Sequence, residues 1–189
     1  MTPSTSDRPR SQQDQFQRDL AVRYDLTTPP ASAQQLGVRD GEISGAFNRD
    51  GDQYWTYDIT LPGGKVFTTQ GFGHVATVDN GQPRTFPGNG VTINSRHADV
   101  EAAINELDKA VPLFGFNARD VQDWAAQARA TPAQAGDLAG FIGKPQGYLT
   151  VAVEVRRSWQ KDEVVLNWDF TWDQPDPTQS SSASTPPLT

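Results

Sequence analysis

The chain contains no cysteine in its 189 residues, which excludes disulfides and thiolate chemistry. It has only two histidines, His74 and His97, and neither has a His, Cys or Glu neighbour at the spacing of metal ligands. We therefore predict packing or surface histidines and no metal site. No apolar run approaches the length of a membrane span, and the polar N-terminus does not follow the signal-peptide pattern. These absences predict a cytoplasmic protein without a membrane partner, although a secreted domain without its leader would look the same.

Motifs for nucleotide binding and nucleophilic catalysis are also missing. The chain has no Walker A sequence, and Gly71-Phe72-Gly73 is interpreted as a turn because it does not form a dinucleotide fingerprint. Ser44 does not lie in a G-x-S-x-G elbow, which is the setting of an activated serine. Asp50 and Asp52 flank a turn and lack the ligand series of a calcium loop. The sequence therefore predicts a protein that is not an enzyme, with no catalytic residues and no cofactor.

Positive charge is scarce. Lys and Arg number 16 against 23 Asp and Glu, which gives a net charge of −7. The isoelectric point is near 4.7 and the mean hydropathy is −0.61. Because Lys and Arg supply most of the non-specific affinity for nucleic acid, this balance argues against a bulk electrostatic DNA binder. A net negative charge is still compatible with a local strip of basic residues on an otherwise acidic protein.

The strongest periodic signal lies in residues 148–172. Two runs alternate between apolar and polar residues and are separated by a charged turn around residues 160–162. Alternation of β-branched and aromatic residues is typical of strands with one buried face, so the two runs predict an antiparallel hairpin. One set of alternating positions in this hairpin comprises Leu149, Val151, Val153, Val155, Val164, Leu166, Trp168, Phe170 and Trp172.

Three earlier strands are expected. Residues 41–47 and 53–61 are predicted to form a hairpin across Asp50-Gly51, which supplies the positive φ of a tight turn. Residues 65–72 form the third strand. Residues 73–90 are rich in Gly, Pro, Asn and Asp and are interpreted as a long loop with a short strand at 74–78.

Helical spacing replaces alternation in the middle of the chain. Residues 95–111 carry an apolar stripe that Asn94 or Ser95 can cap and Pro112 ends. A second helix is predicted over 118–130 behind Asn117. A short third helix is expected from Thr131-Pro132 to near residue 141. Near the N-terminus a thin stripe over residues 11–24 also fits a short helix.

This order predicts one α+β domain over residues 31–172. We expect a mostly antiparallel sheet, or a small OB-like barrel, with a two- to three-helix insert between strands 3 and 4. Residues 1–30 are expected to be an N-terminal tail with a short helix. Residues 173–189 read as a disordered Ser/Pro/Thr tail.

One cluster at the hairpin tip differs from ordinary sheet core. Arg156, Arg157, Trp159 and Lys161 combine cations with an aromatic ring beside a turn, where burial is hard to arrange. Exposed rings stack on bases while cations follow the backbone of single strands. The alternative is a solvated tip with Arg–Glu pairs. The predicted nucleic-acid-binding residues are Arg156, Arg157, Trp159, Lys161, Lys65, Phe67, Lys144 and Trp55.

Several short segments, taken together, resemble a known family. They are INELDKAV at residues 104–111, FIGKP at 141–145 before a V-x-V strand, DGEISGAF at 40–47 and YWTYDITLPGGKVF at 54–67. This layout, over about residues 36–175, resembles a phage-encoded family of small single-stranded-DNA-binding or recombination-accessory proteins. The resemblance implies an early β meander, a helical middle and a C-terminal hairpin. It brings no catalytic residues.

Two functional hypotheses follow. The first is a non-enzymatic single-stranded-DNA-binding accessory protein of phage-type replication or recombination, located in the host cytoplasm. The second is a structural or protein-interaction protein, such as a virion component or assembly adaptor, without nucleic-acid affinity. The second predicts protein partners or self-association, because the acidic body and polar ends suit docking to other chains.

Overall fold

The computed structural model describes residues 21–37, 44–47, 54–78, 88–134, 137–158 and 163–173, with the backbone alone for 44–47. The segments up to the helices are β1 (Ala21–Asp25), the short 3-10 helix η1 (Ala33–Leu36), β2 (Ser44–Phe47), β3 (Trp55–Thr60), β4 (Val66–Gly71), β5 (Gly73–Thr77) and β6 (Asn89–His97). The remaining elements are α2 (Val100–Phe114), α3 (Ala118–Ala130), β7 (Leu138–Ile142), β8 (Leu149–Arg157) and β9 (Val164–Trp172).

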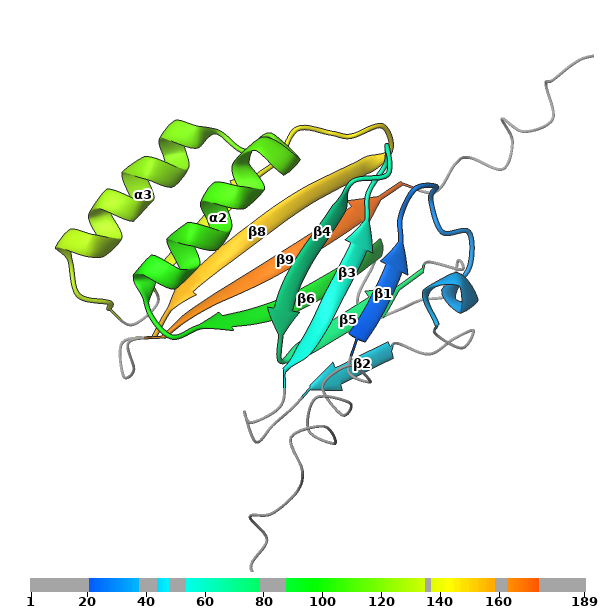
Figure 1. Ribbon diagram of the computed structural model, residues 1–189, viewed down its shortest axis with the longest axis horizontal. Helices are drawn as coiled ribbons and strands as arrows, with labels where there is room; N and C mark the ends of the chain where they lie inside the picture. The colour runs from blue at the N-terminus through cyan, green and yellow to red at the C-terminus, as the bar shows by residue number, and fades with distance from the viewer. Residues whose placement is uncertain are drawn as a thin grey trace, which may run out of the picture.

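The strands form two sheets (Figure 1). The larger has six strands in the order β2-β5-β6-β9-β8-β7, and every neighbouring pair is antiparallel. The smaller has the order β1-β3-β4, with β1 parallel and β4 antiparallel to β3. The predicted hairpin of β8 and β9 is confirmed, and it lies near the middle of the larger sheet because β6 pairs along the whole of β9.

Among the described residues, other elements cover one face of the larger sheet, and none of the described helices or strands covers the other, called here the open face. In Figure 1, α2, α3 and the smaller sheet all lie in front of the larger sheet. The apolar side chains of β9 point into this interface, where the rings of Trp168 and Phe170 lie 4.9 and 5.9 Å from that of Phe67. Phe114 of α2 closes the same cluster at 5.0 Å from Phe67. These aromatic side chains bury the largest apolar areas of the core.

The chain passes from the smaller sheet to the larger through Gly71-Phe72-Gly73. The two sheets approach so closely there that a Cβ on Gly71 would lie 2.7 Å from the carbonyl oxygen of Asn94. The Phe72 N–H donates to that same carbonyl at 2.9 Å. The segment expected to be a turn is therefore a crossing between sheets, and only glycine fits at its first position.

The two helices begin and end at identifiable caps. The carboxylate of Asp99 accepts the N–H of Ala102 at the start of α2, and Gly115 ends that helix in the left-handed region with φ 70°. Asn117 caps α3, as the sequence predicts. Glu101 and Arg129 then join the helices through two hydrogen bonds of 2.6 and 2.8 Å. None of the helices described is both long and apolar enough to cross a membrane.

The α+β class and the mostly antiparallel pairing are confirmed, but the finer architecture differs. The larger sheet does not close into an OB-like barrel, since β2 and β7 stand at its two edges. The two helices lie between β6 and β7, so the expected insert after the third strand is wrong. The end of the expected third helix is instead strand β7. The helix expected over residues 11–24 is wrong for residues 21–24, which belong to strand β1.

Two further pairings also differ. The expected hairpin of residues 41–47 with 53–61 does not form, because β2 pairs with β5 and β3 pairs with β1 and β4. The predicted strand at 74–78 is present as β5, and β6 occupies residues assigned to a loop and a helix start. The predictions for residues 1–20, the turns at 48–52 and 160–162, and the tail from residue 174 lie outside the described residues.

Candidate functional site

The open face of the larger sheet carries rows of aligned side chains. In register, Thr92 of β6 lies beside Asp169 of β9, and Asn94 lies beside Asn167. The rows continue onto β8, where Glu154 is next to Asn167. Three of these rows run across strands of the order β5, β6, β9, β8 and β7. The first is Thr77, Gly90, Thr171 and Thr150, the second is Val75, Thr92, Asp169, Ala152 and Ile142, and the third is Gly73, Asn94, Asn167, Glu154 and Gly140.

These three rows contain two carboxylates and no cation or aromatic ring. The hydroxyl of Thr92 donates to Asp169 at 2.6 Å, and Asn167 donates to Glu154 at 3.2 Å. Burial raises the pKa of Asp169 above its ordinary value, against the bond from Thr92. The bond from Arg156 lowers the pKa of Glu154. A surface that stacks and neutralises single-stranded DNA needs rings and cations, which these three rows lack. The cations Arg96 and Arg156 lie in a fourth row of the same face, and Arg96 lies over the ring of Phe72.

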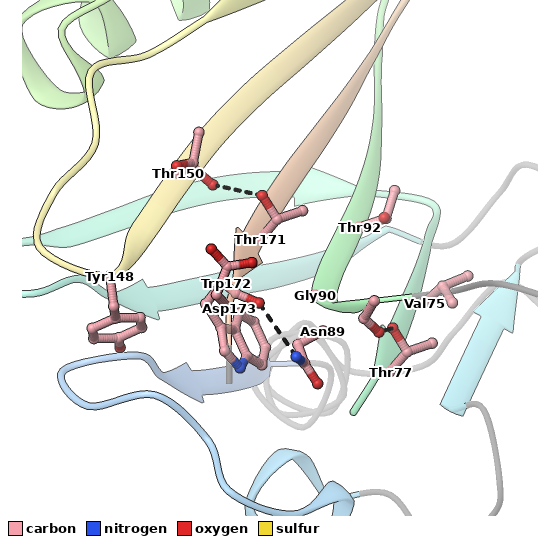
Figure 2. A pocket seen from close by; sticks show the side chains of 11 residues that line it. Val75, Thr77, Asn89, Gly90, Thr92, Tyr148, Thr150, Thr171, Trp172 and Asp173 are labelled. Atoms are coloured by element: carbon pink, nitrogen blue, oxygen red, sulfur yellow. Dashed lines mark hydrogen bonds between the residues drawn. The ribbon is translucent and has the colours of Figure 1, made fainter. Parts of the chain in front are cut away.

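A depression of about 350 Å³ lies at one end of this face (Figure 2). Gly90 leaves space between the neighbouring threonines, and the hydroxyl of Thr171 donates to the carbonyl of Thr150 at 3.3 Å. Asp173 also lines the depression, and none of its lining residues is Lys, Arg or His. A phosphate group would find no opposite charge here. The depression suits a ligand that donates hydrogen bonds.

Strand β7 is one of the two edge strands of the larger sheet. Its pairing with β8 fixes the direction of its backbone N–H and C=O groups. The carbonyl of Asp137 accepts the N–H of Arg157 at 3.2 Å, and the N–H of Gly143 donates to the carbonyl of Val151 at 2.8 Å. Hydrogen-bonded and non-hydrogen-bonded pairs alternate along an antiparallel ladder. The intervening residues Leu138, Gly140 and Ile142 therefore direct their N–H and C=O groups away from β8, toward an edge where no described strand pairs, called here the free edge.

Large apolar side chains accompany these backbone groups. Leu138 is 57% exposed and Ile142 is 74% exposed, and both belong to the open face. Of the four exposed large apolar side chains among the described residues, these are the two that lie on one strand. No Lys, Pro or bulge interrupts β7, although such features usually protect edge strands. A shallow groove of about 380 Å³ runs beside them.

A serine, a histidine and a glutamate meet beneath the sheet, on its covered face. The hydroxyl of Ser95 lies 3.3 Å from Nε2 of His97, and the Glu106 carboxylate lies 3.6 Å from the same nitrogen. In a catalytic triad the acid contacts the other ring nitrogen, and the serine is accessible. Here Ser95 is completely buried. It bonds to Leu166 and Trp168, so the cluster ties β6, β9 and α2 together.

The other histidine is buried between the two sheets. Nδ1 of His74 lies 3.1 Å from the hydroxyl of Tyr57, and the ring of Tyr24 meets it edge to face. Burial lowers the pKa of His74 and raises that of both tyrosines. The cluster is a packed polar contact inside the core. Among the described residues, no group of three or more His, Asp or Glu is placed to hold a metal ion.

The structure separates the predicted nucleic-acid-binding residues. The side chain of Arg157 is only 8% exposed, and it bonds to Asp137 at 3.0 Å and to the carbonyl of Thr131 at 2.6 Å. Arg156 is 59% exposed and pairs with Glu154. Phe67 is buried in the aromatic core and cannot stack on a base in this fold.

The remaining predicted residues lie elsewhere. Lys65 is exposed in the turn between β3 and β4, and Trp55 is half-buried on β3. Lys144 is exposed before β8. Because the preceding Gly143 pairs with Val151, Lys144 lies about 20 Å along β8 from Arg156. Trp159 and Lys161 lie outside the described residues. The residues whose positions are described therefore do not form one cationic surface.

Sequence reasoning missed the β7 edge. Residues 137–142 read DLAGFI, which alternates too briefly to separate a strand from the end of a short helix. The available signal is Gly140, which disfavours a helix and sits between two large apolar residues of the same face. Comparison with family models, curated proteins and solved structures gives no match to this chain.

Proposed function

We propose that this protein is a non-enzymatic binding protein, and that its β7 edge takes up an extended segment of another polypeptide chain. The observation that carries the proposal is the row of outward-directed backbone groups at Leu138, Gly140 and Ile142, which is flanked by two exposed apolar side chains. Such an edge is a template for one more strand. Strand addition of this kind is a common mode of peptide recognition.

The chemistry of the edge specifies the segment. Backbone hydrogen bonds are available to any extended chain, and each contributes about 0.5–1.5 kcal/mol. Selectivity comes from the side chains on the open face, where Leu138 and Ile142 favour apolar partners at alternate positions. Gly140 lies between them and favours a small residue opposite. The segment is therefore extended, with apolar, small and apolar residues on one face.

A polypeptide fits the described surface better than single-stranded DNA. Two of the rows that reach β7 hold Asp169 and Glu154, which repel phosphate, while the row of Leu138 holds Arg156 and Arg96. Of the cations near this edge, Arg157 is bound to Asp137 and Arg156 to Glu154. DNA binding stays a prediction from the sequence, and it serves as the competing outcome in the test.

The test is a fluorescence-anisotropy titration with a dye-labelled peptide of residues 137–144, which carries the apolar, small, apolar pattern. We expect binding to the wild type and at least tenfold weaker binding to the Leu138→Lys/Ile142→Lys variant. Both substituted side chains are exposed, so the variant should fold. Val66→Lys is the matched control, because Val66 is a 53% exposed apolar residue on the smaller sheet.

Two results would contradict the proposal. One is equal peptide affinity for the wild type and the β7 variant. The other is absence of peptide binding together with salt-sensitive binding of an oligothymidine, which would favour the DNA hypothesis.

A further inference from the structure

We infer that the strand added at β7 is β7 of a second copy of this chain. This inference rests on the function proposed above and names the partner of the same edge. The two strands run antiparallel about a two-fold axis through Gly140. Leu138 then lies opposite Ile142 of the second copy, and Ile142 lies opposite Leu138 of the second copy. A two-fold contact of this kind is self-complementary and closed.

The orientation of the backbone makes this register favourable. Leu138, Gly140 and Ile142 all direct N–H and C=O groups to the free edge, as the pairing with β8 requires. Each of the three opposed pairs can exchange two hydrogen bonds, so all six outward donors and acceptors of each copy find partners. A register shifted by one residue would place inward-directed groups against outward ones and lose these bonds.

The side chains agree with the same register. The axis is perpendicular to the sheet, so both copies present Leu138 and Ile142 on the same face, where the two large apolar residues meet across the junction. Gly140 lies opposite Gly140 of the second copy, so no side chain stands at the two-fold axis. A Cβ added there would meet nothing closer than the carbonyl oxygen of Val153 at 3.9 Å.

Opposite charges lie at the two ends of the paired strands. Asp137 precedes β7, and its side chain is 27% exposed although it also accepts a hydrogen bond from Arg157 of the same copy. Lys144 follows β7 and is exposed. In the two-fold register Asp137 lies opposite Gly143 of the second copy, beside Lys144 of the second copy. Symmetry repeats this charge pair at the other end. The complementarity favours a second copy over an unrelated apolar strand.

Site-directed cross-linking tests the inference, because the wild-type chain has no cysteine. Gly140→Cys places one thiol from each copy next to the axis, where paired Cα atoms lie about 5.5 Å apart, within disulfide range. We expect mild oxidation to convert most of this variant to a covalent dimer. Val66→Cys, an exposed thiol on the other sheet, should give little dimer under the same conditions.

The register has its own test. Residues 138 of the two copies lie about 13 Å apart along the strands, beyond disulfide range, so Leu138→Cys alone should not cross-link. A mixture of Leu138→Cys and Ile142→Cys chains should give the mixed dimer. Equal cross-linking of Gly140→Cys and Val66→Cys, or efficient cross-linking of Leu138→Cys to itself, would overturn the two-fold pairing.

The outcomes also separate this inference from the proposed function. If the peptide of residues 137–144 binds at β7 but Gly140→Cys does not cross-link, the edge takes a strand of another protein and the second-copy inference fails. If neither occurs, both fail.

Discussion

Arg156 and Arg157 are neighbours in the sequence but lie in opposite surroundings. The first points to the open face and reaches only the exposed Glu154. The second is held by Asp137 and the carbonyl of Thr131, and its side chain is nearly inaccessible. Alternation along β8 puts consecutive side chains on opposite faces. Arg156 and Arg157 are adjacent in the sequence, but β8 places their side chains on opposite faces of the sheet. They therefore do not form the cationic cluster that the sequence predicts.

We expect Arg157→Ala to lower the free energy of unfolding by about 2–3 kcal/mol, because it leaves Asp137 and a carbonyl without their charged donor. Arg156→Ala should cost less than about 1 kcal/mol, as exposed ion pairs do. Urea unfolding of both variants checks this. Equal losses would show that Arg157 does not anchor the end of β8 as described.

His74 should make stability depend on pH. Burial lowers the pKa of His74 in the folded state. As the pH decreases, the imidazole therefore takes up a proton in the unfolded chain before it does so in the folded chain. Stability is then retained above about pH 6.5 and falls as the pH decreases below that value. Between pH 7.5 and 5.5, His74→Gln should reduce this slope by up to about 1.4 kcal/mol per pH unit. An unchanged slope in urea titrations would contradict the buried neutral state.

Among the helices and strands, those defined by a pattern of a few neighbouring residues could be predicted from the sequence. The hairpin of β8 and β9 and the helix α3 with its Asn117 cap follow from spacing within a few residues. The pairing of β2 with β5 joins segments that the sequence does not mark as partners. The strand β6 was missed because its buried positions include Ser95 and it begins beside a Gly- and Pro-rich stretch. Ser95 satisfies its hydroxyl only through residues far along the chain.

The candidate site was predictable only in part for the same reason. The acidic body and the expected protein partners pointed toward an interaction protein, but the free edge depends on sheet order. In the sequence, Leu138 and Ile142 look like apolar residues of a core. Their exposure follows from the position of β7 at the edge of the sheet. Exposure of this kind is a property of topology, which local periodicity does not encode.

Two glycines near β7 should respond differently to alanine. A Cβ on Gly143 would lie 2.5 Å from the carbonyl oxygen of Phe114 and 3.0 Å from that of Val151. Since backbone atoms must move to relieve this, we expect Gly143→Ala to cost about 1–3 kcal/mol. Gly140→Ala has open space and should leave thermal stability nearly unchanged. Comparable losses in melting temperature would argue against the close contact of Gly143 with the carbonyls of Phe114 and Val151.

At the scale of the whole molecule, net charge gives the competing functions opposite salt dependence. Two copies, each with a charge of −7, repel, and salt screens that repulsion. We therefore expect sedimentation equilibrium to show tighter self-association as NaCl rises from 0.05 to 0.5 M. Binding to single-stranded DNA would weaken over the same range, because salt opposes counterion release. Self-association that weakens over this range would contradict the prediction that repulsion between the two acidic copies dominates its salt dependence.

The most direct test of the β7 edge is amide hydrogen exchange measured residue by residue at low and high protein concentration. The amides of Leu138, Gly140 and Ile142 point to the free edge in one copy, whereas those of Ala139 and Phe141 already face β8. If two copies pair at this edge, a higher concentration slows exchange at the first three amides and leaves the other two unchanged. Exchange at Leu138, Gly140 and Ile142 that stays equally fast at every concentration would contradict pairing at this edge.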